Sequence, residues 1–359
     1  MNSDQNKIVI FAAGTGGHIY PGISIAKELI QNGFSVLWVG TKKGIENKIV
    51  PEAEIQIEYV NFSGLRGKGL LAYIKLPFNL LRAIIQSIVL IRKYKPQIAL
   101  SMGGYISFPC CIASYLLRIP IVIHEQNIIF GMANNILRHL SKKVILGFPM
   151  NLKNIKYKYL GNPSRYENIN KKVKIKFEKK INILVVGGSL GAKIFNEVIP
   201  KTIYSLKETT KYEINVIHQT GKTIKTATDQ YRNIDVNIDI REYIDPMINV
   251  YEWCDIIICR GGAITLTELM NLGIASIIVP FPYATDNHQM KNSRYLESHD
   301  AAIVINQKNF THDHLASIIK SFIENPELKQ SLSENILKLN KKDATKNICD
   351  EIISEIENN

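Results

Sequence analysis

The sequence is poor in cysteine, and its cysteines follow neither a disulfide pattern nor a metal-binding pattern. There are five of them, an odd number, and no Cys-x-x-Cys pair occurs. This count argues against a disulfide framework and against a zinc site. Cys254 and Cys259 lie in or beside a strand-like run, so we expect them to be buried free thiols.

The chain also lacks the segments that carry a protein into or through a membrane. Residues 1–7 are polar and do not contain the apolar core of a secretory signal. No uncharged apolar run reaches the length needed to span a bilayer. We therefore expect a protein of the cytoplasm.

Length and charge narrow the class of protein further. The 359 residues are 46% hydrophobic and carry a formal net charge of +12. Such a length predicts two domains with full cores. The charge predicts anionic partners: nucleic acid, a phosphorylated metabolite or an acidic membrane surface. Because no RNP sequence or similar aromatic-basic motif occurs, we expect no nucleic-acid partner.

Strand and helix patterns alternate through both halves of the chain, which predicts two doubly wound domains with mostly parallel sheets. We expect the first domain at 1–160 and the second at 181–340. Residues 161–180 are interpreted as a linker, because glycine, proline and a lysine-rich tract interrupt the alternation. Residues 341–359 are expected to form a C-terminal helix, and its packing back on the first domain stays open.

A glycine-rich segment, Gly14 to Gly22, follows the first strand-like run. We expect its glycines on a turn before a helix, where backbone N–H groups and the helix start favour an anion. His18 adds a titratable group there. The segment begins like a dinucleotide fingerprint, but Ile19 fills the last glycine position and the second strand ends without Asp or Glu. These absences, and the lack of a P-loop sequence, argue against nicotinamide, flavin and P-loop enzymes.

Four further segments place glycines or polar groups where strands end. Gly187–Ala192 is expected to contact phosphate or sugar, although such a turn also permits close helix packing alone. Ala263–Glu268 opens a helix suited to a diphosphate, with Glu268 either on ribose hydroxyls or in a capping role. Asp286–Gln289 suits sugar hydroxyls, and His124–Asn127 brings two titratable side chains to a strand end.

Taken in order, these segments resemble the MurG family, the N-acetylglucosaminyltransferases that make lipid II of bacterial peptidoglycan. The matching sequences are Gly14-Thr15-Gly16-Gly17 followed by His18-Ile19-Tyr20-Pro21-Gly22, Ser63 to Gly69, Gly103-Gly104-Tyr105, His124 to Asn127, Gly161-Asn162-Pro163, Gly187 to Ala192 and Asp286 to Gln289. They are spread over nearly the whole chain.

The resemblance implies an α/β protein with the GT-B fold, two Rossmann-like doubly wound parallel-sheet domains facing a cleft. It implies that the N-terminal domain takes lipid I, undecaprenyl-diphosphate-MurNAc-pentapeptide, and that the C-terminal domain takes most of UDP-GlcNAc. The implied reaction moves GlcNAc, with inversion, onto the 4-hydroxyl of MurNAc. A GT-B transferase with a different lipid or small-molecule acceptor stays open as the alternative.

The resemblance also implies which residues bind the substrates. Its UDP-GlcNAc contacts fall on Thr15, Gly16, Gly17, Asn127, Arg165, Ser189, Ile244, Ala263, Ile264, Thr265, Leu266, Thr267, Glu268 and Gln289. Transfer to a hydroxyl needs a base on the acceptor side and stabilisation of the leaving diphosphate. His18 is the first candidate for the base and Glu125 is its rival. Because no Asp-x-Asp motif occurs and helix or loop amides can hold the diphosphate, we expect no metal and no cofactor.

A lipid acceptor requires contact with a membrane. The helix expected over about 70–94 mixes large apolar groups with cations, which suits a monotopic patch on anionic lipid. Acceptor or membrane contacts are expected at Arg66, Lys68, Ile74, Phe78, Arg82 and Tyr105. We therefore expect a peripheral protein on the cytoplasmic face of the inner (plasma) membrane. Other cell-wall synthesis proteins stay open as partners.

Three residues depart from the family pattern. Ala13 stands where many members have glycine, Gly261 stands where members usually have serine, and Leu190 replaces a frequent glutamine in the second glycine segment. If the serine hydroxyl contacts phosphate, the second departure lowers the affinity for the donor.

Overall fold

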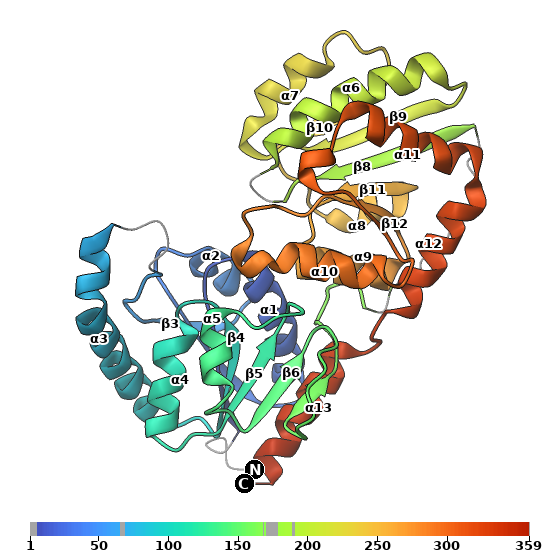
Figure 1. Cartoon of the computed structure of the whole chain (residues 1–359). Helices are drawn as coiled ribbons and strands as arrows, with labels where there is room; N and C mark the ends of the chain where they lie inside the picture. The colour runs from blue at the N-terminus through green and yellow to red at the C-terminus, as the bar shows by residue number, and fades with distance from the viewer. Residues whose placement is uncertain (1–5, 65–68, 168, 170–178, 189–190, 359) are drawn as a thin grey trace. The chain divides into compact units, whose positions relative to one another are not determined.

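The computed structural model describes residues 6–64, 69–167, 169, 179–188 and 191–358 of the chain. It divides into two compact units (Figure 1). Unit 1 comprises Met1–Glu167 together with Lys341–Asn359, and unit 2 comprises Asn168–Asn340.

Unit 1 is built on a seven-stranded parallel sheet. Its strands are β1 (Lys7–Ala12), β2 (Ser35–Gly40), β3 (Gln56–Tyr59), β4 (Ile98–Gly103), β5 (Ile121–Glu125), β6 (Lys143–Leu146) and β7 (Tyr157–Tyr159). Its helices are α1 (Gly16–Gln31), α2 (Glu46–Glu52), α3 (Leu70–Tyr94), α4 (Ser107–Leu116), α5 (Met132–Leu137) and α13 (Ala344–Glu357). The strand order is β3-β2-β1-β4-β5-β6-β7, so the winding reverses between β1 and β4.

The strands β1, β2, β4, β5 and β6 of unit 1 are buried on both faces, which explains their continuous apolar runs. Along β1, Ile8 and Ile10 belong to one hydrophobic cluster, whereas Val9 and Phe11 belong to another. Helix α13 completes the first cluster, because its Ile352 is fully buried there with residues of β1 and α1. In Figure 1 the red α13 accordingly lies beside the blue and green elements of unit 1.

Unit 2 is built on a six-stranded parallel sheet in the order β10-β9-β8-β11-β12-β13. The strands are β8 (Lys180–Val186), β9 (Glu213–Gln219), β10 (Asn237–Arg241), β11 (Ile256–Cys259), β12 (Ala275–Ile278) and β13 (Ile303–Val304). The helices are α6 (Lys193–Thr209), α7 (Ile224–Tyr231), α8 (Met247–Trp253), α9 (Ala263–Leu272), α10 (His288–Glu297), α11 (His312–Glu324) and α12 (Pro326–Lys338). The α/β class with parallel sheets is thus confirmed.

Two local predictions differ from the structure. The first concerns the glycine segment, because Gly16, Gly17 and His18 form the first turn of α1 rather than the turn before it. Thr15 takes the N-cap position, and its carbonyl accepts a hydrogen bond from the His18 N–H at 3.0 Å. The helix therefore starts five residues before Pro21, so Pro21, which has no N–H to donate, lies inside α1 rather than at its first position.

The second difference concerns the segment interpreted as a linker. Its first residues, 161–167, belong to unit 1, and Gly161 to Ser164 are buried. Asn162 donates a side-chain hydrogen bond to the carbonyl of Gln126 at 3.0 Å. The glycine and proline content predicted a linker, but tertiary contacts hold this stretch against the end of β5.

Candidate functional site

The carboxyl ends of β1, β4 and β5 lie side by side in the sheet of unit 1, beside the point where the winding reverses. Parallel α/β sheets bind ligands at such ends. His18 comes from the helix after β1, Tyr105 from the turn after β4, and Asn127 from the turn after β5. Unit 1 therefore brings together the predicted base and the predicted contacts of its three loops.

Two glycines after β4 make room for this arrangement. Gly103 has φ +93°, and a Cβ there would lie 3.2 Å from Cε1 of the His18 ring. Gly104 has φ +82°, and a Cβ there would lie 2.4 Å from the carbonyl oxygen of Ala13. A side chain at 104 would thus clash with backbone in a conformation that L residues rarely adopt. The glycine pair sets how closely β4 and the imidazole approach.

A hydrogen-bonded chain leads from His18 into the core of unit 1. His18 Nδ1 lies 3.0 Å from Oε1 of Gln126. Nε2 of Gln126 lies 2.8 Å from the Met102 carbonyl and 3.1 Å from Nδ1 of His124. Nε2 of His124 lies 3.0 Å from the Gly161 carbonyl. Burial lowers the pKa of His124 to about 4, so this ring is neutral at pH 7.

Glu125, the rival base, accepts hydrogen bonds from the loop that follows it. Its Oε1 accepts from the backbone N–H of Asn127 at 3.1 Å and from the Asn127 side chain at 3.2 Å. Its Oε2 accepts from the Gly131 N–H at 3.0 Å and from the Asn134 side chain at 2.9 Å. These four contacts are those of a carboxylate that shapes a loop and places Asn127.

A second buried carboxylate was missed by sequence reasoning. Glu46, at the start of α2, is fully buried and accepts from the N–H and hydroxyl of Thr41 at 3.0 and 2.7 Å. It also accepts from the Gly14 N–H at 3.3 Å, and the Thr41 hydroxyl lies 3.1 Å from the hydroxyl of Tyr105. Glu46 thus ties the first glycine loop to Tyr105, and a lone glutamate after the second strand gave no signal of that.

The remaining predicted contacts of unit 1 lie around the start of α1. Thr15 is exposed at the N-cap, with Gly16 and Gly17 directly after it. The exposed Arg165 places its guanidinium 4.8 Å from the ring centre of Tyr20 and 5.2 Å from that of Tyr166. This stacking orients a cation next to the glycines of the first helical turn.

In unit 2 the predicted donor contacts also follow the carboxyl ends of strands. Gln219, the last residue of β9, donates to the Gly188 carbonyl at 2.9 Å and accepts from the Ile244 N–H at 3.0 Å. One side chain therefore joins the glycine loop after β8 to the buried Ile244 after β10. Because the Ile244 amide is engaged in this way, only its carbonyl is left to contact a base.

Helix α9 begins the next part of the unit 2 site. Gly262 is its N-cap, so Ala263 to Glu268 form its first two turns. Glu268 is buried, and its Oε2 accepts a hydrogen bond from the Tyr251 hydroxyl at 2.8 Å. The N-terminus of α9 carries the positive end of the helix dipole, which suits a phosphate.

Gln289 and Arg260 lie at the adjoining strand ends. Gln289, the second residue of α10, accepts from the Phe281 N–H at 2.9 Å. Arg260 donates to the Val279 carbonyl at 2.9 Å, and its guanidinium lies over the rings of Phe195 and Phe281. Burial lowers the pKa of Arg260 to about 10, which leaves the side chain charged at pH 7. Its position directly before Gly261 could have marked it in the sequence.

The predicted membrane contacts Ile74, Phe78 and Arg82 are exposed along α3. Three other predicted residues, Arg66, Lys68 and Ser189, lie outside the described residues. Within the described ranges, no three His, Cys, Asp or Glu side chains converge as a metal-ion site.

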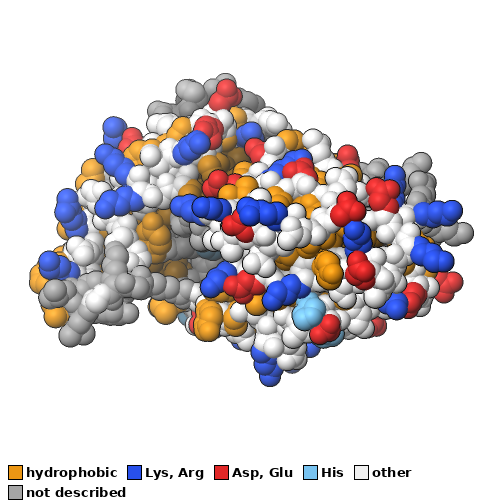
Figure 2. Space-filling view, turned by 90° about the horizontal axis from the view of Figure 1, so that it is seen from above, with side chains coloured by type: hydrophobic (Ala, Val, Ile, Leu, Met, Phe, Trp, Pro, Cys, Tyr) orange, Lys and Arg blue, Asp and Glu red, His pale blue; other side chains and the backbone are white. Residues whose placement is uncertain are grey.

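Helix α3 has one packed side and one exposed apolar side. Its buried residues Ala83, Ser87 and Ile91 recur every four positions. On the exposed side lies an apolar stripe formed by Ile74, Phe78, Leu81, Ile85 and Val89, between 53% and 77% exposed. Figure 2 shows hydrophobic and basic side chains together at its left edge, the side on which α3 is drawn in Figure 1.

The segment Ile74–Tyr94 of α3 is long and apolar enough to cross a membrane, with a mean hydropathy of 1.6. Little of this segment is buried. This result rests only on the length and composition of the segment. The packed side of α3 belongs to the core of unit 1.

Comparison with known proteins gives concordant matches for both units. The model of the glycosyltransferase family 28 N-terminal domain matches residues 8–146, and that of the family 28 C-terminal domain matches residues 182–348. A Haemophilus ducreyi protein is 39% identical, with 94% of this chain and 95% of the relative covered. It is named UDP-N-acetylglucosamine–N-acetylmuramyl-(pentapeptide) pyrophosphoryl-undecaprenol N-acetylglucosamine transferase, as is a Pseudoalteromonas translucida protein of 37% identity covering 98% and 99%.

Among solved structures, that of Acinetobacter baumannii MurG is similar over 97% of this chain and 99% of its own. The TM-score is 0.83 and the sequences are 31% identical.

Proposed function

This chain belongs to the MurG family of glycosyltransferases, and on that premise we propose how its residues carry out the transfer. It is an N-acetylglucosaminyltransferase that moves GlcNAc from UDP-GlcNAc to MurNAc-pentapeptide pyrophosphoryl-undecaprenol, which yields lipid II. The roles of the individual residues and the contact with the membrane are our proposals.

In the proposed reaction the 4-hydroxyl oxygen of MurNAc attacks C1 of GlcNAc. The new O–C1 bond forms as the bond between C1 and the β-phosphate oxygen breaks, with inversion at C1. UDP leaves with the bonding electron pair, and the hydroxyl proton passes to a base of the protein. His18 is that base, and a base of this kind accelerates such a step by about 10²–10⁴-fold.

The contrast between His18 and Glu125 carries this assignment. Both oxygens of Glu125 accept hydrogen bonds from the following loop. The His18 ring is bonded through Nδ1, and no described residue is hydrogen-bonded to its Nε2. An imidazole with one nitrogen held and the other open can both keep its orientation and take a proton.

We propose donor contacts among the predicted residues of each unit. The Ile244 carbonyl accepts from N3–H of uracil, Glu268 binds ribose hydroxyls, and the amides of Ala263 to Thr267 with Ser189 hold the diphosphate. In unit 2, Gln289 binds the sugar. In unit 1, the proposed donor contacts are Asn127, Arg165, Thr15, Gly16 and Gly17. The α9 dipole and the charged Arg260 stabilise the leaving UDP.

The test is UDP release from UDP-GlcNAc with and without a lipid I analogue. We expect release to depend on the analogue, and His18→Ala to lower kcat by at least about 10²-fold. Its dissociation constant for UDP-GlcNAc should change by less than about twofold, because the donor contacts remain. His139→Ala, at an exposed histidine of the same unit, should leave both quantities unchanged. Near-normal turnover of His18→Ala would rule out His18 as the base.

We further propose that the α3 stripe rests on an anionic membrane surface. The exposed cations Lys75, Arg82, Arg92 and Lys93 accompany the stripe, and no acidic residue occurs in the helix. Apolar side chains that enter the headgroup region together with flanking cations give reversible, salt-dependent binding.

Vesicle flotation tests this contact. The double variant Phe78→Ser with Leu81→Ser should bind phosphatidylglycerol vesicles at least about tenfold more weakly, since each buried large apolar side chain contributes about 1.5–3 kcal/mol. Tyr204→Ser, which removes a similarly exposed ring from unit 2, is the matched control and should bind normally. Equal flotation of both variants would remove the stripe from the membrane contact.

A further inference from the structure

We propose that Gln126 is a positioning residue that holds the His18 imidazole in its Nδ1–H tautomer, which leaves Nε2 as the proton acceptor. The inference rests on the proposed role of His18 as the base. It concerns which ring nitrogen is basic and which residues decide that.

The orientation of the Gln126 side-chain amide follows from a backbone carbonyl. A carbonyl oxygen can only accept, so the amide atom 2.8 Å from the Met102 oxygen must be the NH₂ group. The other amide atom, which lies 3.0 Å from His18 Nδ1, is therefore the oxygen. Because that oxygen can only accept, Nδ1 of His18 must carry the hydrogen.

His124 supports the same orientation from a second carbonyl. Its Nε2 lies 3.0 Å from the Gly161 oxygen and must therefore carry a hydrogen. The ring is fully buried and its pKa is lowered to about 4, so it is neutral and its Nδ1 is bare. That bare nitrogen accepts from the Gln126 NH₂ group at 3.1 Å. The carbonyl acceptors of Met102 and Gly161 thus determine the donor and the acceptor of each hydrogen bond that links His18, Gln126 and His124.

Burial makes this orientation hard to reverse. Gln126 is 2% exposed, and its backbone carbonyl accepts from the Asn162 side chain. A flipped amide would place its oxygen against the Met102 oxygen and against the bare nitrogen of His124. Two buried acceptors would then face a third acceptor, and such groups are costly to leave unsatisfied.

The tautomer decides whether the ring can act as a base. A neutral imidazole has one N–H and one lone pair, and in the other tautomer Nε2 would already hold the proton. A ring in that form could donate to the acceptor hydroxyl but could not take its proton at Nε2. Loss of the Gln126 oxygen should therefore reduce turnover while UDP-GlcNAc still binds.

Ring ¹⁵N shifts of the full chain labelled in histidine report the tautomer directly. The His18 signal, identified by its loss in His18→Ala, should show Nδ1 protonated and Nε2 bare in the wild type. Gln126→Met removes the amide at similar volume and should give a mixture with the Nε2–H form. Gln126→Glu keeps an accepting oxygen toward His18 and, with its other carboxyl oxygen protonated toward the Met102 carbonyl, should retain the Nδ1 proton, which a merely structural role would not predict. A wild-type His18 ring in the Nε2–H form would overturn the proposal, even if the variants failed to fold.

Kinetics supply the second measurement. Gln126→Met should lower kcat by about tenfold or more, with a change of less than about twofold in the KM for UDP-GlcNAc. If His18→Ala keeps its turnover, the assignment of the base fails. If His18→Ala loses turnover but the His18 tautomer is unchanged in Gln126→Met, the base stands and the positioning role of Gln126 is excluded.

Discussion

Position 261 shows how a single residue is explained by its neighbours. A Cβ at Gly261 would lie 2.5 Å from the carbonyl oxygen of Gln289 and 2.4 Å from Oγ of Ser293. The start of α10 therefore packs directly against this glycine. Another departure from the family pattern, Ala13, is buried in a core cluster of unit 1, where its methyl group packs.

We expect Gly261→Ser to weaken donor binding in this protein. The added Cβ must displace the start of α10, which carries Gln289, and overpacking of this kind costs about 1–3 kcal/mol. The KM for UDP-GlcNAc should rise and the thermal midpoint should fall. Gly262→Ser is the matched control for stability, because its Cβ would lie 3.8 Å from Thr265 and serine suits an N-cap. A lower KM for Gly261→Ser would show instead that the hydroxyl reaches phosphate.

At this scale the sequence predicts residues in motifs better than the residues that support them. Gly14 to His18 and His124 to Asn127 stand out because glycines and titratable groups follow apolar runs. Glu46 carries no such mark, because its role depends on where α2 places it beside Gly14. The direction of the Gln126 amide depends on two carbonyls far from it in the chain, which no spacing reveals.

Helices show the same division between local and long-range causes. The range 70–94 expected for the long basic helix is that of α3, since its apolar periodicity and its end near Lys95 are local signals. The start of α1 was placed too late, because glycines were interpreted as turn residues. β7 has no signal of its own in the sequence, because a three-residue strand exists only through its pairing with β6.

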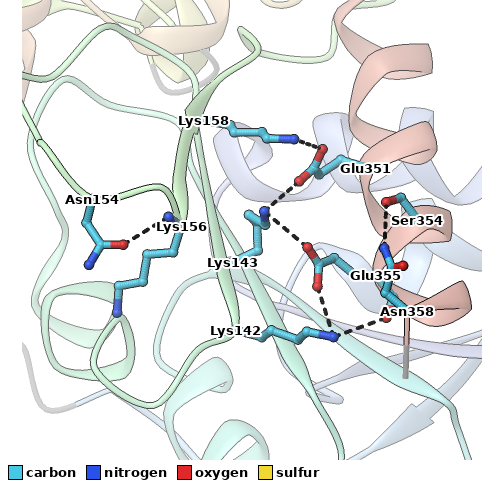
Figure 3. Close-up of polar contacts among 9 residues, drawn as sticks. All are labelled: Lys142, Lys143, Asn154, Lys156, Lys158, Glu351, Ser354, Glu355 and Asn358. Carbon is cyan, nitrogen blue, oxygen red and sulfur yellow. Dashed lines mark hydrogen bonds and ion pairs between the residues drawn. The ribbon is translucent and has the colours of Figure 1, made fainter.

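Helix α13 is held to unit 1 by ion pairs as well as by its apolar face. Glu355 pairs with Lys142 and Lys143, and Glu351 pairs with Lys143 and Lys158 (Figure 3). Burial opposes the charge on Lys143, but the hydrogen bonds and charges of the two glutamates outweigh it and raise the pKa of Lys143. The network joins the last helix to the β6–β7 edge of the sheet.

Glu355→Gln should therefore destabilise unit 1 in a pH-dependent way. Burial raises the pKa of Glu355, but Lys142 and Lys143 outweigh it and lower that pKa below its ordinary value of 4.5. A carboxylate whose pKa is lowered in the folded state stabilises the fold at pH values above its ordinary pKa. This stabilisation is lost as the pH falls through the pKa of the folded state. In urea unfolding, Glu355→Gln should lower the free energy of unfolding by about 1–2 kcal/mol at pH 7, a value between the usual contributions of exposed and of buried ion pairs. This difference should shrink below pH 4.5.

Glu357→Gln is the matched control, since it removes the same charge from the exposed end of α13. A loss for Glu355→Gln that equals the control, or that persists unchanged at low pH, would mean that the ion pairs add nothing to the apolar docking of the helix.

For the whole molecule, the alternation of strands and helices was enough to predict two parallel α/β units, because each βαβ segment carries its own periodic signal. The exact boundary between the two units was not predicted, because Gly161 to Ser164 resemble a linker in sequence but are held in unit 1 by Gln126 and His124. The return of α13 to unit 1 depends on its apolar contacts with α1 and β1, which lie more than three hundred positions earlier in the chain.

The two units should also respond differently to UDP alone. The proposed uracil, ribose and diphosphate contacts at Ile244, Glu268 and the first turns of α9 all lie in unit 2. When UDP is present at about 100 times its dissociation constant, hydrogen exchange at these amides should slow by up to the equivalent of about 2.7 kcal/mol. The strands β1, β4 and β5 of unit 1 should exchange as before. Uridine, which lacks the diphosphate, is the control and should protect the α9 amides less, because it leaves the helix N-terminus without an anion. Protection by UDP confined to unit 1 would contradict the assignment of the nucleotide to the carboxyl ends of β10 and β11, because a ligand slows exchange where it binds.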